Sequence, residues 1–147
     1  MISSLADFGV GAGTVTGLTG VWTASGAAPA AGATAESVAA DVATGSLRKI
    51  GSIGIHVSRG VTTHGLAVNV SNDLQPFEWI VPCGIEGCRM TSLTRELGSE
   101  QDVDAFADVL TQRYAESYER RPVVVSVAQL SERLGPARRE AAPGALR

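Results

Sequence analysis

The chain has 147 residues, of which 44% are hydrophobic and 18% charged, and its net charge is −3. This length favours one domain, and the composition supplies enough apolar side chains for a core. The acidic balance and the lack of a basic stripe argue against nucleic acid as a partner.

The beginning of the chain has the features of neither a secretion signal nor a membrane anchor. It lacks a basic start followed by a compact apolar segment. Residues 8–35 carry no charge, but Gly, Ala, Thr, Ser and Pro dominate them, so we expect no membrane span there. Two cysteines are too few for a disulfide framework. The sequence therefore predicts a soluble cytoplasmic protein.

The first predicted elements are short and rich in glycine. Residues 3–10 are interpreted as the end of a helix with Gly9 as its stop, and residues 17–24 as a short strand. An Ala/Gly-rich stretch over residues 23–46 has no large apolar face. It predicts a long loop or a weak helix over residues 35–43.

The central segment alternates as strands do. Residues 48–60 place Ile53, Ile55 and Val57 on one side and small or polar residues on the other, which predicts a half-buried strand. Residues 63–73 alternate similarly, so the two are expected to pair as antiparallel neighbours. Residues 77–84 form a third apolar run, interpreted as a strand that Pro82 stops.

The remaining segments are mainly helical in pattern. Residues 90–98 are predicted to be helical, and residues 99–121 form an amphipathic helix with Ser99 as its cap. We expect a last edge strand over residues 122–127. Residues 128–147 are polar and are predicted to be a helical turn followed by a disordered tail. Strands followed by helices predict an α+β fold, with a mixed or antiparallel sheet packed against helices.

Cys83 is the first candidate for chemistry. Pro82 before it stiffens the approach, and Gly84 after it permits a sharp turn and a close approach of a substrate to the backbone. A cysteine at such a place is held rigidly and exposed. The structural alternative is a small buried hydrophobe, which describes most free cysteines.

Cys88, five positions later, is a weaker candidate for a nucleophile, because the residues beside it do not suggest a special position. A Cys83–Cys88 disulfide is sterically feasible but disfavoured in a cytosolic setting. Zinc bound by both cysteines, His56 and His64 has suitable donor atoms. However, the C-x4-C and H-x7-H spacings match no standard ligand pattern, so we expect no metal.

Lys49 is the other informative residue, because it is the only lysine in a chain with eleven arginines. Its retention suggests that a compact ammonium is needed at that point, although chance remains the simpler alternative. The functional interpretation places Lys49 near Cys83. There an ammonium would favour thiolate over thiol and could relay protons to an attacking amine.

Five motifs in a fixed order resemble the octanoyltransferases of lipoate biosynthesis. They are K-[IVL]-x-x-[IL]-G at residues 49–54, R-G at 59–60, H-G-x-A-x-N at 64–69, D-L-x-x-F at 73–77 and P-C-G at 82–84. The resemblance extends over about residues 4–120. It implies a catalytic domain like that of biotin and lipoate protein ligases, with Cys83 as the acyl-thioester cysteine and Lys49 as its partner.

The resemblance also implies a reaction in two steps. Cys83 would take an octanoyl group from octanoyl-acyl carrier protein. A lysine on a lipoyl domain of a 2-oxoacid dehydrogenase subunit, or on the glycine-cleavage H protein, would then receive it as an amide. A thioester donor is already activated, so no ATP and no cofactor are implied.

Carried across from the family, the acyl pocket corresponds to six residues, and two polar residues nearby are candidates for a supporting role. Small side chains among the six would leave room for an alkyl chain against the backbone. The pocket residues are Ser52, Ile53, Gly54, Gly65, Leu66 and Ala67, and the supporting candidates are His64 and Asn69.

The chain departs from the family by lacking the upstream R-G-G-x-x-[TY]-x-H-G-P-G-Q motif that lines the acyl pocket. We therefore expect residues 1–127 to be the C-terminal portion of an N-terminally truncated catalytic domain. The rival interpretations are an inactive remnant or interaction protein of the same fold and, less favoured, a zinc-binding module.

Overall fold

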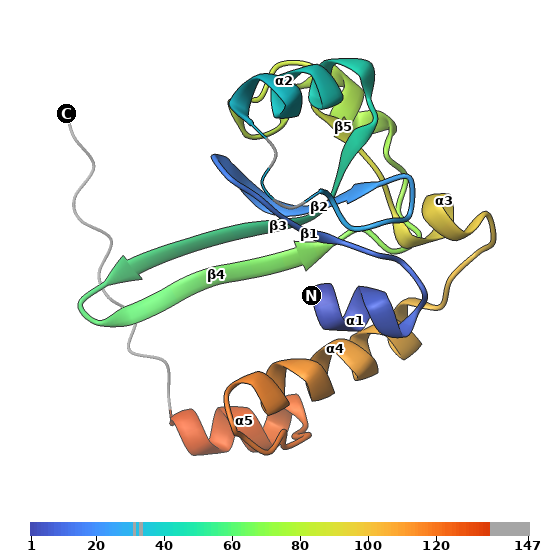
Figure 1. Cartoon of the computed structure of the whole chain (residues 1–147). Helices are drawn as coiled ribbons and strands as arrows, with labels where there is room; N and C mark the ends of the chain where they lie inside the picture. Colours follow the sequence, from blue (N-terminus) through green and yellow to red (C-terminus); the bar gives the residue numbers. More distant parts are fainter. Residues whose placement is uncertain (31, 33, 136–147) are drawn as a thin grey trace.

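The computed structural model describes residues 1–30, 32 and 34–135. Its centre is a mixed sheet in the order β1-β2-β3-β4, with antiparallel neighbours, and β5 pairs in parallel with β3 (Figure 1). The predicted α+β class with a mixed sheet is confirmed. The strands are β1 (Gly13–Val15), β2 (Leu18–Ala24), β3 (Leu47–Ser58), β4 (Val61–Val68) and β5 (Arg89–Met90).

Helices cover both faces of the sheet (Figure 1). On one face lie α1 and α4, and on the other lies α2. No described helix is long and apolar enough to cross a membrane. The helices are α1 (Ile2–Asp7), α2 (Ala35–Thr44), α3 (Leu93–Leu97), α4 (Val103–Ser117) and α5 (Val127–Leu134), with short 3-10 helices η1 (Gln75–Trp79) and η2 (Pro82–Gly84).

The sheet separates two apolar clusters. The larger cluster lies between the sheet and the α1–α4 layer, where Leu5, Ile50 and Phe106 are almost fully buried. The smaller cluster lies under α2 and consists of Trp22, Val38, Val42 and Leu47. Arg113 of α4 donates two hydrogen bonds, of 2.7 and 2.8 Å, to Asp7 at the end of α1. This pair joins the two helices of the larger cluster at the surface.

The β3–β4 hairpin extends beyond the rest of the sheet after Gly51 of β3. β2 pairs with β3 only as far as Gly51, whereas β4 pairs with β3 all the way to Ser58. The half-burial predicted for this strand therefore applies only to its beginning, because Ile55 is 61% exposed and Val57 63% exposed. The free end of the hairpin extends away from the helical layers (Figure 1).

Two predicted strands are wrong. Residues 77–84 do not form a strand, because they lie largely in two 3-10 turns, η1 and η2, each of which has a proline in its first turn that cannot donate to a strand ladder. Residues 122–127 form no strand either, because the chain there approaches α5. Ser126 starts α5 with a capping box in which Gln129 returns the hydrogen bond.

Smaller differences concern helix boundaries. α4 is capped by Asp102, which accepts hydrogen bonds from two backbone N–H groups, and not by Ser99. The Ala/Gly-rich stretch contains a regular helix, α2, capped by Thr34 and ended by left-handed Gly45. α5 occupies the start of the segment predicted as a tail, and residues 136–147 lie outside the described residues.

Candidate functional site

The site is built on the first part of β3, where the backbone of Lys49 has strand neighbours on both sides. Lys49 pairs with Trp22 of β2 and with Met90 of β5. The backbone N–H of Thr91 donates a 2.9 Å hydrogen bond to the Lys49 carbonyl. The Cα position of Lys49 is therefore fixed by two neighbouring strands, which a terminal or edge residue would lack.

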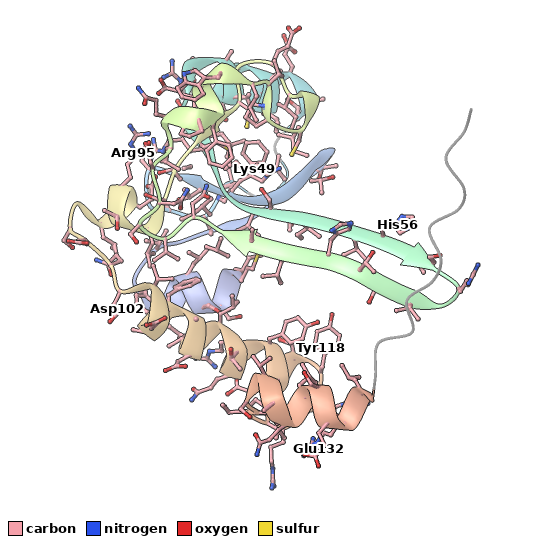
Figure 2. All side chains as sticks on the ribbon, turned by 180° about the vertical axis from the view of Figure 1, so that it is seen from behind. Lys49, His56, Arg95, Asp102, Tyr118 and Glu132 are labelled. Carbon is pink, nitrogen blue, oxygen red and sulfur yellow. The ribbon has the colours of Figure 1, made fainter. Side chains whose placement is uncertain are left out.

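The Lys49 side chain is buried, with 1% of its surface exposed, and its amine is held by three contacts. Nζ donates to the Thr19 carbonyl at 2.7 Å and to Cys83 Sγ at 3.1 Å. It also lies 5.6 Å from the centroid of the Trp22 ring, within the range of a cation–π interaction. These contacts aim a single ammonium at the cysteine sulfur. Figure 2 shows Lys49 beside the sheet.

Gly20 makes room for this lysine, and the sequence interpretation missed it. A Cβ atom at Gly20 would lie 2.5 Å from Lys49 Cε and 2.6 Å from the Gly51 carbonyl oxygen. Gly20 also has φ +124°, which L side chains rarely adopt. An isolated glycine inside the strand "LTGVWTA" signals a close approach of this kind, so the sequence did carry the clue.

Cys83 lies in the short turn η2, between buried Pro82 and left-handed Gly84. Its own φ and ψ are 56° and 21°, a left-handed conformation that is uncommon for a residue with a side chain. Cys83 is exposed, although its sulfur contacts a buried ammonium. The turn thus presents the thiol to solvent on one side and to Lys49 on the other, as an exposed nucleophile requires.

Cys88 differs from Cys83 in environment. It is partly buried and packs against the apolar cluster under α2. Burial raises the pKa of the Cys88 thiol above its ordinary value, with the Lys49 charge opposing and the Cys83 charge reinforcing the change. Cys88 is therefore held as a neutral thiol near neutral pH, which makes it a poor nucleophile.

The six residues predicted to line an acyl pocket form three cross-strand pairs on the hairpin: Ser52 with Ala67, Ile53 with Leu66, and Gly54 with Gly65. They do not share one face. Ile53 and Leu66 line a groove with Leu110 and Tyr114 of α4, which the backbone of Gly65 also borders. Alternation turns the Cβ side of the other four residues to the opposite face.

A register shift between Val21 and Trp22 of β2 leaves Ile50 as an extra residue in β3, so that this opposite face is the side on which Lys49 contacts Trp22 and α2 lies over the sheet. Cβ atoms built on Gly54 and Gly65 would meet nothing within 4 Å, so the face is open. The open strip made by Ser52, Gly54, Gly65 and Ala67, called here the small-residue face, continues along β3 from Lys49. The two large aliphatic residues of the predicted set, Ile53 and Leu66, lie outside it.

The supporting candidates fall at two different places. Asn69 donates from Nδ2 to the Thr91 carbonyl at 3.0 Å, and its backbone N–H donates to the Ile50 carbonyl at 3.0 Å. It thus joins the end of β4 to the segment that holds Lys49. His64 pairs with Ile55 on the exposed part of the hairpin and lines the groove facing α4, with φ +67°.

No three His, Cys, Asp or Glu side chains gather closely enough to hold a metal ion within residues 1–30, 32 and 34–135. The donors of the zinc alternative are dispersed, since His56 lies toward the free end of the hairpin, far from Lys49 (Figure 2).

The sequence matches a protein-family model and is similar to curated proteins. Residues 1–115 match the family model described as the lipoyl protein ligase A/B catalytic domain. The chain belongs to this family. The match includes the segments that carry Lys49, Cys83 and the small-residue face, and it agrees with the predicted ligase-like fold.

Several relatives in this family are named octanoyltransferase. The one from Citrifermentans bemidjiense is 40% identical over 114 residues, which is 78% of this chain and 45% of the relative. The one from Mycobacterium sp. strain KMS is 40% identical over 128 residues, 87% of this chain and 47% of the relative. That from Roseiflexus sp. strain RS-1 is 39% identical over 142 residues, 95% and 51%. The chain spans about half the length of these curated relatives.

Proposed function

We propose that the chain is an acyltransferase of lipoate biosynthesis. It would take an octanoyl group from octanoyl-acyl carrier protein as a thioester on Cys83 and pass it to a lysine of a lipoyl domain. The observation that carries the proposal is the buried ammonium of Lys49, held 3.1 Å from the sulfur of an exposed cysteine. The relatives named octanoyltransferase supply the reaction class.

In the first step the Cys83 thiolate attacks the thioester carbonyl of the donor. A new S–C bond forms on Cys83, and the bond to the donor sulfur breaks. The departing thiolate takes a proton from Lys49 and leaves as a thiol, so Lys49 becomes a neutral amine. The buried position of Lys49 supports this role, because an ammonium held by fixed acceptors needs little reorganisation during the reaction.

In the second step the amine of the acceptor lysine attacks the Cys83 thioester. An amide bond forms, and Cys83 leaves as a thiolate. The proton lost by the attacking nitrogen goes to Lys49, which is again an ammonium beside the thiolate. Both steps exchange one acyl bond for another, so no ATP is consumed. Acceptors of this kind are the lipoyl domains of 2-oxoacid dehydrogenase subunits and the glycine-cleavage H protein.

The small-residue face is the proposed place for the octanoyl chain. It begins three residues along β3 from Lys49, and the Gly54–Gly65 pair forms its far end. An alkyl chain could there lie directly against the backbone, as the open space above both glycines permits. Ser52 and Ala67 flank the pair on the side nearer to Lys49.

The test is mass spectrometry of the intact chain after incubation with octanoyl-acyl carrier protein. We expect one octanoyl adduct, lost in Cys83→Ala and retained in Cys88→Ala, because only Cys83 is both exposed and in contact with Lys49. Adding a lipoyl domain should discharge the adduct and acylate the acceptor. An adduct that is lost only in Cys88→Ala would contradict the assignment.

A second candidate is a non-catalytic interaction protein with the same fold, and the exposed Ile55 and Val57 of the hairpin favour it. This candidate predicts no adduct under the same conditions. It also predicts that the Cys83→Ala variant keeps whatever partner binding the wild-type chain has, because no thioester is then part of the function.

A further inference from the structure

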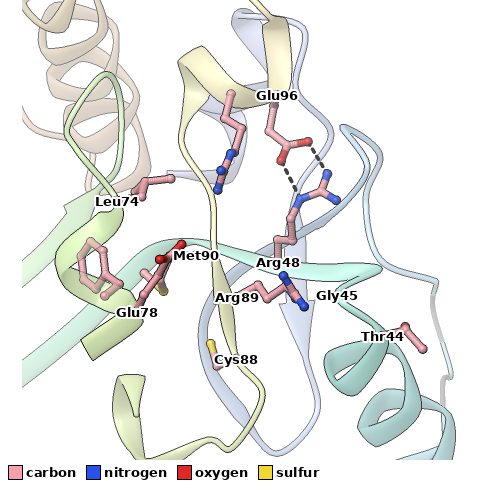
Figure 3. A pocket seen from close by; sticks show the side chains of 11 residues that line it. Thr44, Gly45, Arg48, Leu74, Glu78, Cys88, Arg89, Met90 and Glu96 are labelled. Carbon is pink, nitrogen blue, oxygen red and sulfur yellow. Dashed lines mark hydrogen bonds and ion pairs between the residues drawn. The ribbon is translucent and has the colours of Figure 1, made fainter. Parts of the chain in front are cut away.

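A second cavity, of about 750 Å³, opens beside β5 (Figure 3). Its walls come from the end of α2, the beginning of β3, η1, β5 and α3. Three arginines and two glutamates contribute to the lining: Arg48, Arg89, Arg95, Glu78 and Glu96.

One of the three arginines is fully engaged. Arg48 donates from Nε and Nη2 to the two oxygens of Glu96, both at 2.9 Å. Glu96 also accepts a 2.6 Å hydrogen bond from Thr91 Oγ1, and its side chain is 2% exposed. This pair forms a fixed wall of the cavity (Figure 3).

The other two arginines have no such partner. Among the described residues, neither Arg89 nor Arg95 forms an ion pair, and neither side chain donates a hydrogen bond. The carboxylate left to balance them in the cavity is that of Glu78. Two guanidinium forks therefore border one concavity without a full set of acceptors, in a chain whose net charge is −3.

The local backbone accommodates Arg89 in particular. A Cβ atom at Gly45 would lie 2.5 Å from Arg89 Cδ and 2.6 Å from Arg89 Nε. Gly45 ends α2 in a left-handed conformation, φ +75°, so a glycine serves both the helix end and the arginine. The Arg89 side chain, which lines the cavity, therefore packs closely against the end of α2.

The cavity adjoins the reactive pair. Cys88 and Met90 line it; Met90 pairs with Lys49, and the charges of Lys49 and Cys83 both act on Cys88. Along β3 the order is Arg48 at the cavity, then Lys49, then the small-residue face. A thioester reacting at Cys83 would have its acyl chain on one side and the rest of the donor on the other.

We propose that this cavity binds the phosphodiester of the pantetheine arm on which an acyl carrier protein holds its thioester, with Arg89 and Arg95 as the phosphate ligands. The inference rests on the proposed function and names how the donor is recognised. Guanidinium forks bind phosphate oxygens through paired, charge-assisted hydrogen bonds. A cavity of this size can enclose an extended small-molecule arm, which a flat protein surface could not do.

The experiment compares three octanoyl donors: the carrier protein, free octanoyl-phosphopantetheine, and octanoyl-N-acetylcysteamine, which has no phosphate. Arg89→Ala and Arg95→Ala should each raise KM by about tenfold for the two phosphate-bearing donors. KM for the N-acetylcysteamine thioester and kcat for all three should stay unchanged. Arg133→Ala on α5, which removes an arginine far along the chain from the cavity, is the matched control.

Other results would overturn the inference. Equal effects on all three donors would mean that the arginines only support the fold, as a cation beside the C-terminal end of α2 would. An effect limited to the carrier protein would mean that they meet carboxylates of the carrier and not its phosphate.

A direct binding measurement separates this inference from the proposed function. Calorimetry should detect binding of phosphopantetheine but not of pantetheine to the Cys83→Ala chain, and Arg89→Ala should abolish it. Binding without acylation from any donor would refute the transferase and leave the phosphate site standing. Acylation from all donors without phosphopantetheine binding would refute the phosphate site alone.

Discussion

At the scale of single residues, the contact between Lys49 and Cys83 depends on three separate segments. β3 supplies the lysine, the turn η2 supplies the cysteine, and Thr19 on β2 supplies the carbonyl that fixes the amine. The sequence predicted that Lys49 and Cys83 lie close together, because the motifs that carry them are local. It did not predict Thr19 or Gly20, because a carbonyl acceptor and a missing Cβ gain meaning only once β2 is paired with β3.

Removing the Lys49 charge should make Cys83 less reactive, because a positive charge placed 3.1 Å from a cysteine sulfur favours attack by that sulfur. In a Cys88→Ala background, Lys49→Met keeps most of the side-chain volume and should slow alkylation by iodoacetamide at pH 7 by about tenfold. Lys49→Arg retains charge without the compact geometry and should recover alkylation better than acyl transfer. Equal alkylation rates in wild type and Lys49→Met would remove the electrostatic role.

Gly20→Ala should disturb the site although residue 20 takes no part in the chemistry. The new Cβ would overlap Lys49 Cε and the Gly51 carbonyl, and overpacking of this kind costs about 1–3 kcal/mol of unfolding free energy. We expect a matching loss in urea denaturation and slower Cys83 alkylation. Gly17→Ala is the control, because its Cβ would meet nothing within 4 Å although its φ is also positive. Similar alkylation rates in the two variants would show that Lys49 tolerates the added methyl group.

At the scale of elements, the carboxylate of Glu96 on α3 binds Arg48 on β3, and folding changes the pKa of this carboxylate. Burial would raise the pKa of Glu96, but hydrogen bonds from Arg48 and Thr91 and the Arg48 charge outweigh it and lower the pKa below the ordinary 4.5. A lowered pKa means that the folded state holds the proton less tightly than the unfolded chain. The stabilisation is therefore complete above about pH 4.5 and is lost as the pH falls through the lowered value.

Glu96→Gln tests this link between the elements. At pH 7 the substitution should lower the unfolding free energy by about 1–3 kcal/mol, because it leaves Arg48 without its carboxylate. The difference from wild type should shrink as the pH falls below 4.5, because the unfolded chain then binds a proton at Glu96 that the folded chain does not, and it should vanish below the lowered pKa of the folded state. Urea denaturation at a series of pH values measures it, and a difference independent of pH would contradict the assignment.

Some elements could be predicted from the sequence and others could not. The β3–β4 hairpin and α4 were predicted because each carries a long periodic pattern. The segment 77–84 was assigned to a strand because its residues are apolar, yet Trp79, Ile80 and Val81 are all more than half exposed. Their hydrophobicity does not reflect burial within this chain, and two prolines decide the local backbone. The apolar composition of a run does not by itself separate a buried strand from an exposed turn segment such as this one.

At the scale of the whole molecule, the hairpin is the least covered part of the fold. β4 forms the edge of the described sheet, and its partner strand exposes Ile55 and Val57. Unpaired strand edges beside apolar side chains favour association. The pairing of β3 with β4 was predictable from alternation. The lack of cover was not, because alternation shows that one face is apolar and does not show what lies against it.

We therefore expect the chain to associate as its concentration rises. Light scattering after size exclusion should give a mass that increases with loading, and Ile55→Lys should shift it toward the monomer by placing a charge on the exposed face. Val124→Lys, at a site that is 99% exposed before α5, is the matched control and should change little. A strictly monomeric wild-type chain at all concentrations would contradict this expectation.

The burial of the only lysine has a practical consequence for following the protein's motions. Any reagent that acylates lysine side chains can modify just one, Lys49, and that residue is 1% exposed. Acetic anhydride should therefore add to this side chain only when β2, β3 and the turn at Cys83 separate. The acetylation rate, measured on the peptide that contains residue 49, then reports how often the site opens, without any introduced label.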